Sequence, residues 1–167
     1  MSEGGVCGVN YRGHLTVGIA TFMLLYVLLF LLNIRISALN TLIGFFVCMF
    51  GSLAPDLDIK SSKIHRWSYI GAFFTGIALF FLIVNDDFIT ALVISSVITC
   101  ILFLSVFFLA KLKHRGFTHH MSGFILFVIC VLLFFHLIKM HVPLLSPEVV
   151  TLFGASGYLS HIIADFI

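Results

Sequence analysis

The chain has 167 residues, of which 61% are hydrophobic and only 10% are charged, and its formal net charge is +2. A soluble domain is usually about 45–50% apolar and about 25% charged, so this composition excludes an ordinary soluble protein and indicates an integral membrane protein. The small net charge gives no support to nucleic-acid binding. The four cysteines are not spaced as close pairs, so we interpret them as small buried hydrophobes rather than a redox or zinc motif.

Apolar runs separated by short polar connectors predict six helices. The first run would be about 27 Å long as a helix, which is enough to cross a bilayer core. The second run stops at Pro55, because proline disfavours helix at the residue before it. The six runs cover residues 15–32, 39–53, 69–84, 88–110, 121–138 and 149–167. We therefore expect an all-α integral membrane protein, with about six transmembrane helices in one bundle and a single polytopic domain over residues 1–167.

The lysines and arginines predict the orientation of the chain in the bilayer. Seven of the nine fall in the N-terminal tail and in the second and fourth connectors, which would lie on one side of the membrane. Only Arg35 and Lys139 fall on the other side. Because cytoplasmic loops carry the excess of positive charge, we expect both termini and the connectors 55–68 and 111–120 in the cytoplasm.

In this topology four polar patches meet at the cytoplasmic face. They contain His14, Asp56, Asp58, His114, His119, His120, His161 and Asp165. Such convergence is what a metal site built from several helices requires. By contrast, His136 and His141 fall at the opposite face, and His65 has no partner at helical spacing.

The first two patches each have a structural alternative. A histidine at the start of a membrane helix, such as His14, is often an interfacial residue and not a ligand. Asp56 and Asp58 follow Pro55 and could form an ordinary turn. If this segment is extended, however, the i, i+2 spacing places both carboxylates on one side, as two metal ligands would require.

The segment 114–120 contains three histidines, an arginine and a hydroxyl group. Gly116 permits a turn that brings the flanking histidines together. Thr118 is a natural N-cap for the fifth helix, which would place the next two residues, both histidines, in its first turn. There the helix dipole favours the neutral imidazole that binds metal, and Arg115 suits an anionic group such as a phosphate. The alternative is a basic loop that contacts lipid headgroups.

The last helix carries the clearest local signal. His161 and Asp165 are four residues apart, so they share one helix face. Ionisable residues inside a membrane span are rare and are usually functional. A single inward hydrogen-bonded pair with a structural role is the alternative.

Four segments together resemble one known family. They are Gly13-His14-Leu15, Ala54-Pro55-Asp56-Leu57-Asp58, His114-Arg115-Gly116-Phe117-Thr118-His119 and Gly157-Tyr158-Leu159-Ser160-His161-Ile162-Ile163-Ala164-Asp165. In this order they are similar to the YdjM-type bacterial inner-membrane proteins, which are described as membrane-bound metal-dependent hydrolases. The resemblance implies a bacterial inner-membrane location and a metal site formed by His14, Asp56, Asp58, His114, His119, His161 and Asp165. It also implies further chain after the last motif, so we expect this sequence to be shortened at its C-terminus relative to the family.

The function that we expect is hydrolysis by a cytoplasm-facing His/Asp metal centre that activates water. Mixed nitrogen and carboxylate ligands suit zinc, with manganese or iron as alternatives. Seven candidates exceed the usual ligand number of one ion, so either two ions bind or some residues support the others. Asp58 or Asp165 would accept a proton from water. Arg115 would hold an oxygen of a lipid or phosphoester substrate.

The alternative function is non-enzymatic. The protein would then be a metal-binding transporter, or a membrane scaffold whose His–Asp pairs are structural. A transporter needs polar residues along a path near the bilayer midplane, and the third to fifth runs contain few of them. The sequence makes no prediction of the oligomeric state.

Overall fold

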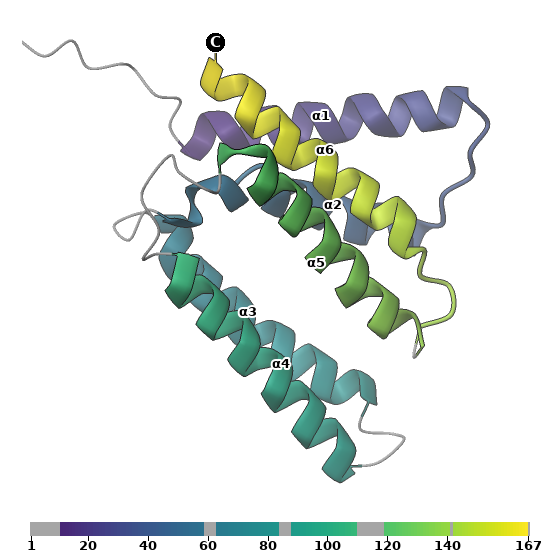
Figure 1. Ribbon diagram of the computed structural model, residues 1–167. Coiled ribbons are helices and arrows are strands. Elements are labelled where there is room, and N and C mark those ends of the chain that lie inside the picture. The colour runs from purple at the N-terminus through teal and green to yellow at the C-terminus, as the bar shows by residue number, and fades with distance from the viewer. Residues whose placement is uncertain (1–10, 59–62, 84–87, 110–118, 141, 167) are drawn as a thin grey trace, which may run out of the picture.

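The computed structural model describes residues 11–58, 63–83, 88–109, 119–140 and 142–166 (Figure 1). Within these ranges six α-helices and one short 3₁₀ helix, η1, form, and there is no strand. Their bounds are α1 Tyr11–Leu31, α2 Ala38–Gly51, η1 Ala54–Asp58, α3 Lys63–Ile83, α4 Phe88–Leu109, α5 Met121–Lys139 and α6 Pro147–Phe166. The all-α prediction is therefore confirmed.

Three of these helices are long and apolar enough to cross a membrane. They are α1 over Arg12–Leu31, α5 over Met121–Lys139 and α6 over Pro147–Phe166. Ala38–Gly51 and Phe88–Leu104 form shorter apolar helices. Large apolar side chains such as Leu24 and Phe30 are exposed on the outer face of α1, which lipid tolerates and water does not.

Helix α6 lies at the centre of the packing. It contacts α2, α5 and α1, and α1 also packs on α2 (Figure 1). Helices α3 and α4 pack on each other and contact the remaining helices mainly through η1. The helices thus form a group of four with an attached α3–α4 hairpin, and not the uniform bundle expected from the sequence.

Glycines bring α2 and α6 into backbone contact. A Cβ atom on Gly157 would collide with the backbone oxygen of Cys48, and one on Gly51 would collide with the backbone oxygen of Gly154. Small residues at a membrane helix crossing allow this close approach. Because the two backbones approach so closely, the end of α2 lies beside the last turns of α6, one helical turn beyond the crossing.

A polar clamp joins these helices at their other end. Asn40, only 4% exposed, lies in the first turn of α2. Its Nδ2 donates to the Leu144 carbonyl oxygen at 3.1 Å, and the Ser146 backbone N–H donates to its Oδ1 at 2.8 Å. Asn40 therefore ties the start of α2 to the connector before α6. Nothing in our sequence analysis singled it out.

The start of α3 and the N-cap of α5 differ most from the prediction. Helix α3 begins at Lys63, six residues before the apolar run, because the residues 63–68 include no proline or glycine that would stop the helix. Helix α5 begins at Met121, and His120 is its N-cap with φ −103° and ψ 163°. The prediction that His119 and His120 occupy the first turn is therefore wrong. The His120 carbonyl instead accepts the first helical hydrogen bonds, and Thr118, the predicted N-cap, lies outside the described residues.

Candidate metal centre

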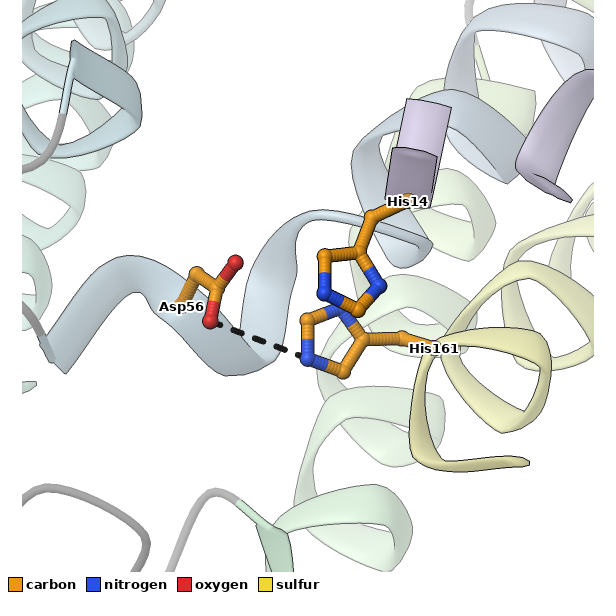
Figure 2. Close-up of side chains that lie close together, drawn as sticks. All are labelled: His14, Asp56 and His161. Atoms are coloured by element: carbon orange, nitrogen blue, oxygen red, sulfur yellow. Dashed lines mark ion pairs between the residues drawn. The ribbon is translucent and has the colours of Figure 1, made fainter. Parts of the chain in front are cut away.

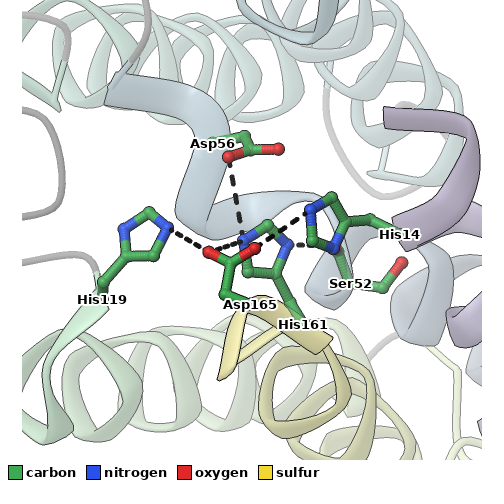
Figure 3. A network of polar contacts seen from close by, with 6 residues as sticks. All are labelled: His14, Ser52, Asp56, His119, His161 and Asp165. Atoms are coloured by element: carbon green, nitrogen blue, oxygen red, sulfur yellow. Dashed lines mark hydrogen bonds and ion pairs between the residues drawn. The ribbon is translucent and has the colours of Figure 1, made fainter. Parts of the chain in front are cut away.

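Five polar side chains from four parts of the chain meet at one end of the molecule (Figure 3). Helices α1 and α5 begin at this end, whereas α2 and α6 finish there (Figure 1). The first turn of α1 supplies His14, η1 supplies Asp56, and His119 lies directly before α5. His161 and Asp165 lie in the last turns of α6. The helix directions thus explain why residues far apart in the sequence become neighbours.

His161 is fully buried, and a backbone carbonyl fixes its orientation. Its Nδ1 lies 2.8 Å from the carbonyl oxygen of Ser52. Because a carbonyl oxygen only accepts hydrogen bonds, Nδ1 carries the proton of the neutral ring and Nε2 keeps its lone pair. This Nε2 faces two carboxylates, with Asp165 Oδ2 at 3.5 Å and Asp56 Oδ1 at 3.7 Å (Figures 2 and 3). Metal-binding histidines are commonly oriented by such a bond through their other nitrogen.

Asp165 is the carboxylate shared by three histidines. Its Oδ2 lies 3.2 Å from His119 Nε2 as well as 3.5 Å from His161 Nε2. Its other oxygen, Oδ1, lies 3.3 Å from His14 Nε2 (Figure 3). The i, i+4 spacing of His161 and Asp165 accounts for one of these contacts, and tertiary packing brings the other two.

His14 is buried against the ring of His161. It is 2% exposed, and the two ring centroids are 3.8 Å apart with an angle of 17° between the planes (Figure 2). By contrast, His119 meets His161 edge to face, with centroids 5.4 Å apart and an interplanar angle of 65°. Among the residues that the structure describes, none forms a hydrogen bond with His14 Nδ1.

The donor atoms lie close enough together to share one metal ion. Two groups of three have all their donor atoms within 4.8 Å of one another: His14, Asp56 and His161, and His119, His161 and Asp165. Bonds of about 2.0–2.1 Å in a tetrahedral zinc site separate neighbouring donors by about 3.3 Å. The contacts of Asp165 Oδ2 at 3.2 and 3.5 Å match that separation, whereas a charge-assisted hydrogen bond is usually about 2.7–2.9 Å long. The side chains therefore fit a divalent ion.

The other side chains predicted for the site are not among those that the structure describes. His114, Arg115 and the side chain of Asp58 lie outside the described residues. Of the two alternatives that the sequence left open for Asp56 and Asp58, a turn and an extended pair, the structure does not have the extended pair, because both residues lie in η1. With about three residues per turn, i and i+2 positions do not share a face of a 3₁₀ helix, and Pro55, whose φ is fixed near −65°, favours this helical turn.

Sequence reasoning missed Ser52. Its contribution is a backbone oxygen, which any residue type could supply, so the residue identity gives no signal.

The comparisons with known proteins address the family. None of the curated proteins and none of the solved structures compared with the chain matches it. A family model described as YdjM inner membrane protein matches residues 9–167. The match covers all the cluster residues and nearly the whole sequence, so the resemblance inferred from the four motifs is confirmed: the chain belongs to the YdjM inner membrane protein family.

Proposed function

We propose that this protein is a membrane-bound metal-dependent hydrolase whose ion is held by His119 Nε2, His161 Nε2 and Asp165 Oδ2. The observation that carries the proposal is the geometry of this group. Asp165 Oδ2 faces both nitrogens at 3.2 and 3.5 Å, and the Ser52 carbonyl keeps the His161 lone pair on Nε2. Three protein ligands with one further position open are the usual donor set of a catalytic zinc ion.

Two imidazoles and one carboxylate suit zinc best, with manganese or iron as alternatives. A bound divalent ion would lower the pKa of water and stabilise the charge that develops on the attacked group. The chain's own residues would hold the ion, orient the substrate and take the proton.

Among the carboxylates whose side chains the structure describes, Asp56 is the one best placed to accept that proton. Its Oδ1 lies 3.7 Å from His161 Nε2, next to the proposed ligand group. Asp165, which the sequence suggested for this role, is already in contact with three histidines, and this suits a ligand better than a base. The sequence-based roles of Asp58 as a base and of Arg115 as a phosphate-binding residue remain part of the proposal.

The substrate class that we propose is a lipid or another phosphoester at the membrane surface. The cluster lies at the ends of helices that include all three candidate spans, so an ester group of a lipid headgroup could reach it from the bilayer. With the predicted orientation this face is cytoplasmic.

Metal analysis of the detergent-purified protein tests the proposal. We expect about one ion per chain in the wild type and in Glu148→Gln, which changes an exposed acidic residue in the first turn of the same helix. Asp165→Asn should lose the ion while circular dichroism shows an intact helical fold, because an amide is a poorer ligand of similar shape. Wild-type protein without bound metal, and with a stability indifferent to chelator, would favour the alternative that the His–Asp contacts only join helices.

A further inference from the structure

We infer that His14 does not bind the ion held by His161 and instead positions Asp165. In this assignment the Nε2–H of His14 holds Asp165 Oδ1, so that Oδ2 faces His119 and His161. The cluster then holds one ion per chain, and not two. The inference rests on the proposed function, and it removes from the ligand set a residue that the sequence placed there.

Ring stacking provides the first argument. An imidazole binds a metal through a lone pair that lies in the plane of its ring, about 2.0–2.1 Å from the nitrogen. The rings of His14 and His161 are nearly parallel, at 17°, with centroids 3.8 Å apart. An ion on the in-plane lone pair of His161 would therefore lie well out of the plane of the His14 ring. The edge-to-face rings of His119 and His161, at 65°, can direct both lone pairs to one point.

The two oxygens of Asp165 provide the second argument. Oδ2 faces the nitrogens of His119 and His161, whereas Oδ1 forms an ion pair with His14 Nε2 among the residues that the structure describes. A carboxylate with one oxygen toward the ligand group and the other toward a ring N–H is held in orientation, as ligating carboxylates commonly are.

The proton of His14 provides the third argument. The neutral ring has one N–H, and a buried N–H is rarely left without an acceptor. No described residue forms a hydrogen bond with Nδ1, but Asp165 Oδ1 is 3.3 Å from Nε2. The proton therefore belongs on Nε2. Nε2, the nitrogen of His14 that faces Asp165, then has no lone pair left for a metal.

Nuclear magnetic resonance of the wild-type protein tests the assignment directly. The protein would be labelled with ¹⁵N-histidine and loaded with ¹¹³Cd²⁺ as the probe ion. We expect ¹¹³Cd–¹⁵N couplings to His119 and His161, and for His14 the signals of a neutral ring with its proton on Nε2. A coupling to His14, or two cadmium ions per chain, would overturn the inference.

Variants give a second measurement, with Co²⁺ absorption to report the ligand set and dye competition to report affinity. His14→Gln places an amide N–H near the former Nε2 but supplies a poor ligand, so we expect the wild-type Co²⁺ spectrum and less than about a tenfold loss of affinity. His14→Phe keeps a ring but loses the donor, and should weaken binding by about 10–100-fold with the spectrum unchanged.

Matched substitutions complete the test. His161→Gln should lose the ion, whereas His120→Gln, at an exposed N-cap whose side chain makes no capping bond, should bind as the wild type does. If the wild type binds one ion and His14→Gln binds none, the inference about His14 is overturned but the proposed function is not. A wild type that binds neither Cd²⁺ nor Co²⁺ would overturn the proposed function and, with it, the role of His14.

Discussion

Replacing Gly157 with alanine tests how the α2–α6 crossing supports the site. The added Cβ would collide with the backbone oxygen of Cys48, and a backbone atom cannot swing aside as a flexible side chain can. Overpacking of this kind usually costs about 1–3 kcal/mol, and the better helix propensity of alanine offsets up to about 1 kcal/mol. We therefore expect a loss of about 1–2 kcal/mol, or roughly 2–8 °C in the unfolding midpoint for a chain of this length.

The same change should reach the cluster. Ser52 lies four residues beyond Cys48 and His161 four residues beyond Gly157, so one helical turn separates the collision from the 2.8 Å contact between them. If α2 moves away by about 1 Å, that contact exceeds hydrogen-bonding distance. His161 then loses the group that fixes its proton on Nδ1, and we expect zinc affinity to fall by about 10–100-fold.

The assay combines thermal unfolding in detergent with zinc competition against a chelating dye. Gly71→Ala is the matched control, because a Cβ on Gly71 in α3 would meet nothing within 4 Å. This variant should be as stable as the wild type or slightly more stable, with unchanged zinc affinity. A Gly157→Ala protein that behaves like Gly71→Ala in both measurements would refute the argument that the glycine contact positions His161.

Three further predictions concern the clamp, the metal and the topology. Asn40→Leu leaves the Ser146 N–H without its acceptor, so we expect a loss of about 1–3 kcal/mol in unfolding free energy. The zinc content should not change, because the clamp and the His–Asp cluster lie at opposite ends of the α2–α6 pair. A variant that also loses zinc would contradict this independence. Chelator should lower the unfolding midpoint of the wild type, because an ion present at 100 times its Kd contributes about 2.7 kcal/mol; an unchanged midpoint would count against a bound ion. In a cysteine-free background, an impermeant thiol reagent added to intact cells should label Asp86→Cys and not Lys60→Cys, and the reverse would invert the predicted orientation.

The helices could be predicted from the sequence because apolar runs are long and the connectors are short. Hydropathy, however, reports which residues favour lipid, and not where backbone hydrogen bonding stops. Helix α3 therefore extends to Lys63, into a segment that reads as polar connector. The attachment of the α3–α4 hairpin through η1 depends on packing between distant segments, which no local pattern records.

The site was predictable where its residues follow a helical period. The i, i+4 spacing pairs His161 with Asp165, and in the structure His161 Nε2 lies 3.5 Å from Asp165 Oδ2. The stacking of His14 on His161 and the carbonyl contact of Ser52 could not be predicted, because both depend on how closely α1, α2 and α6 approach. The order of the helices and the predicted topology indicate which side chains could meet, and tertiary packing decides which nitrogen of each ring faces which oxygen.

The two ends of the α2–α6 pair allow a comparison within one molecule. At the Asn40 end, side-chain and backbone groups form hydrogen bonds of 2.8, 3.1 and 3.3 Å between single donors and acceptors. At the other end, one carboxylate oxygen, Asp165 Oδ2, lies 3.2 Å from His119 Nε2 and 3.5 Å from His161 Nε2. If both clusters only joined helices, the same optimisation of hydrogen bonds would be expected at both ends. Instead, a single oxygen of Asp165 faces two imidazole nitrogens at about the separation of neighbouring donors around a shared ion, and this arrangement supports the proposed metal-binding role over a purely structural one.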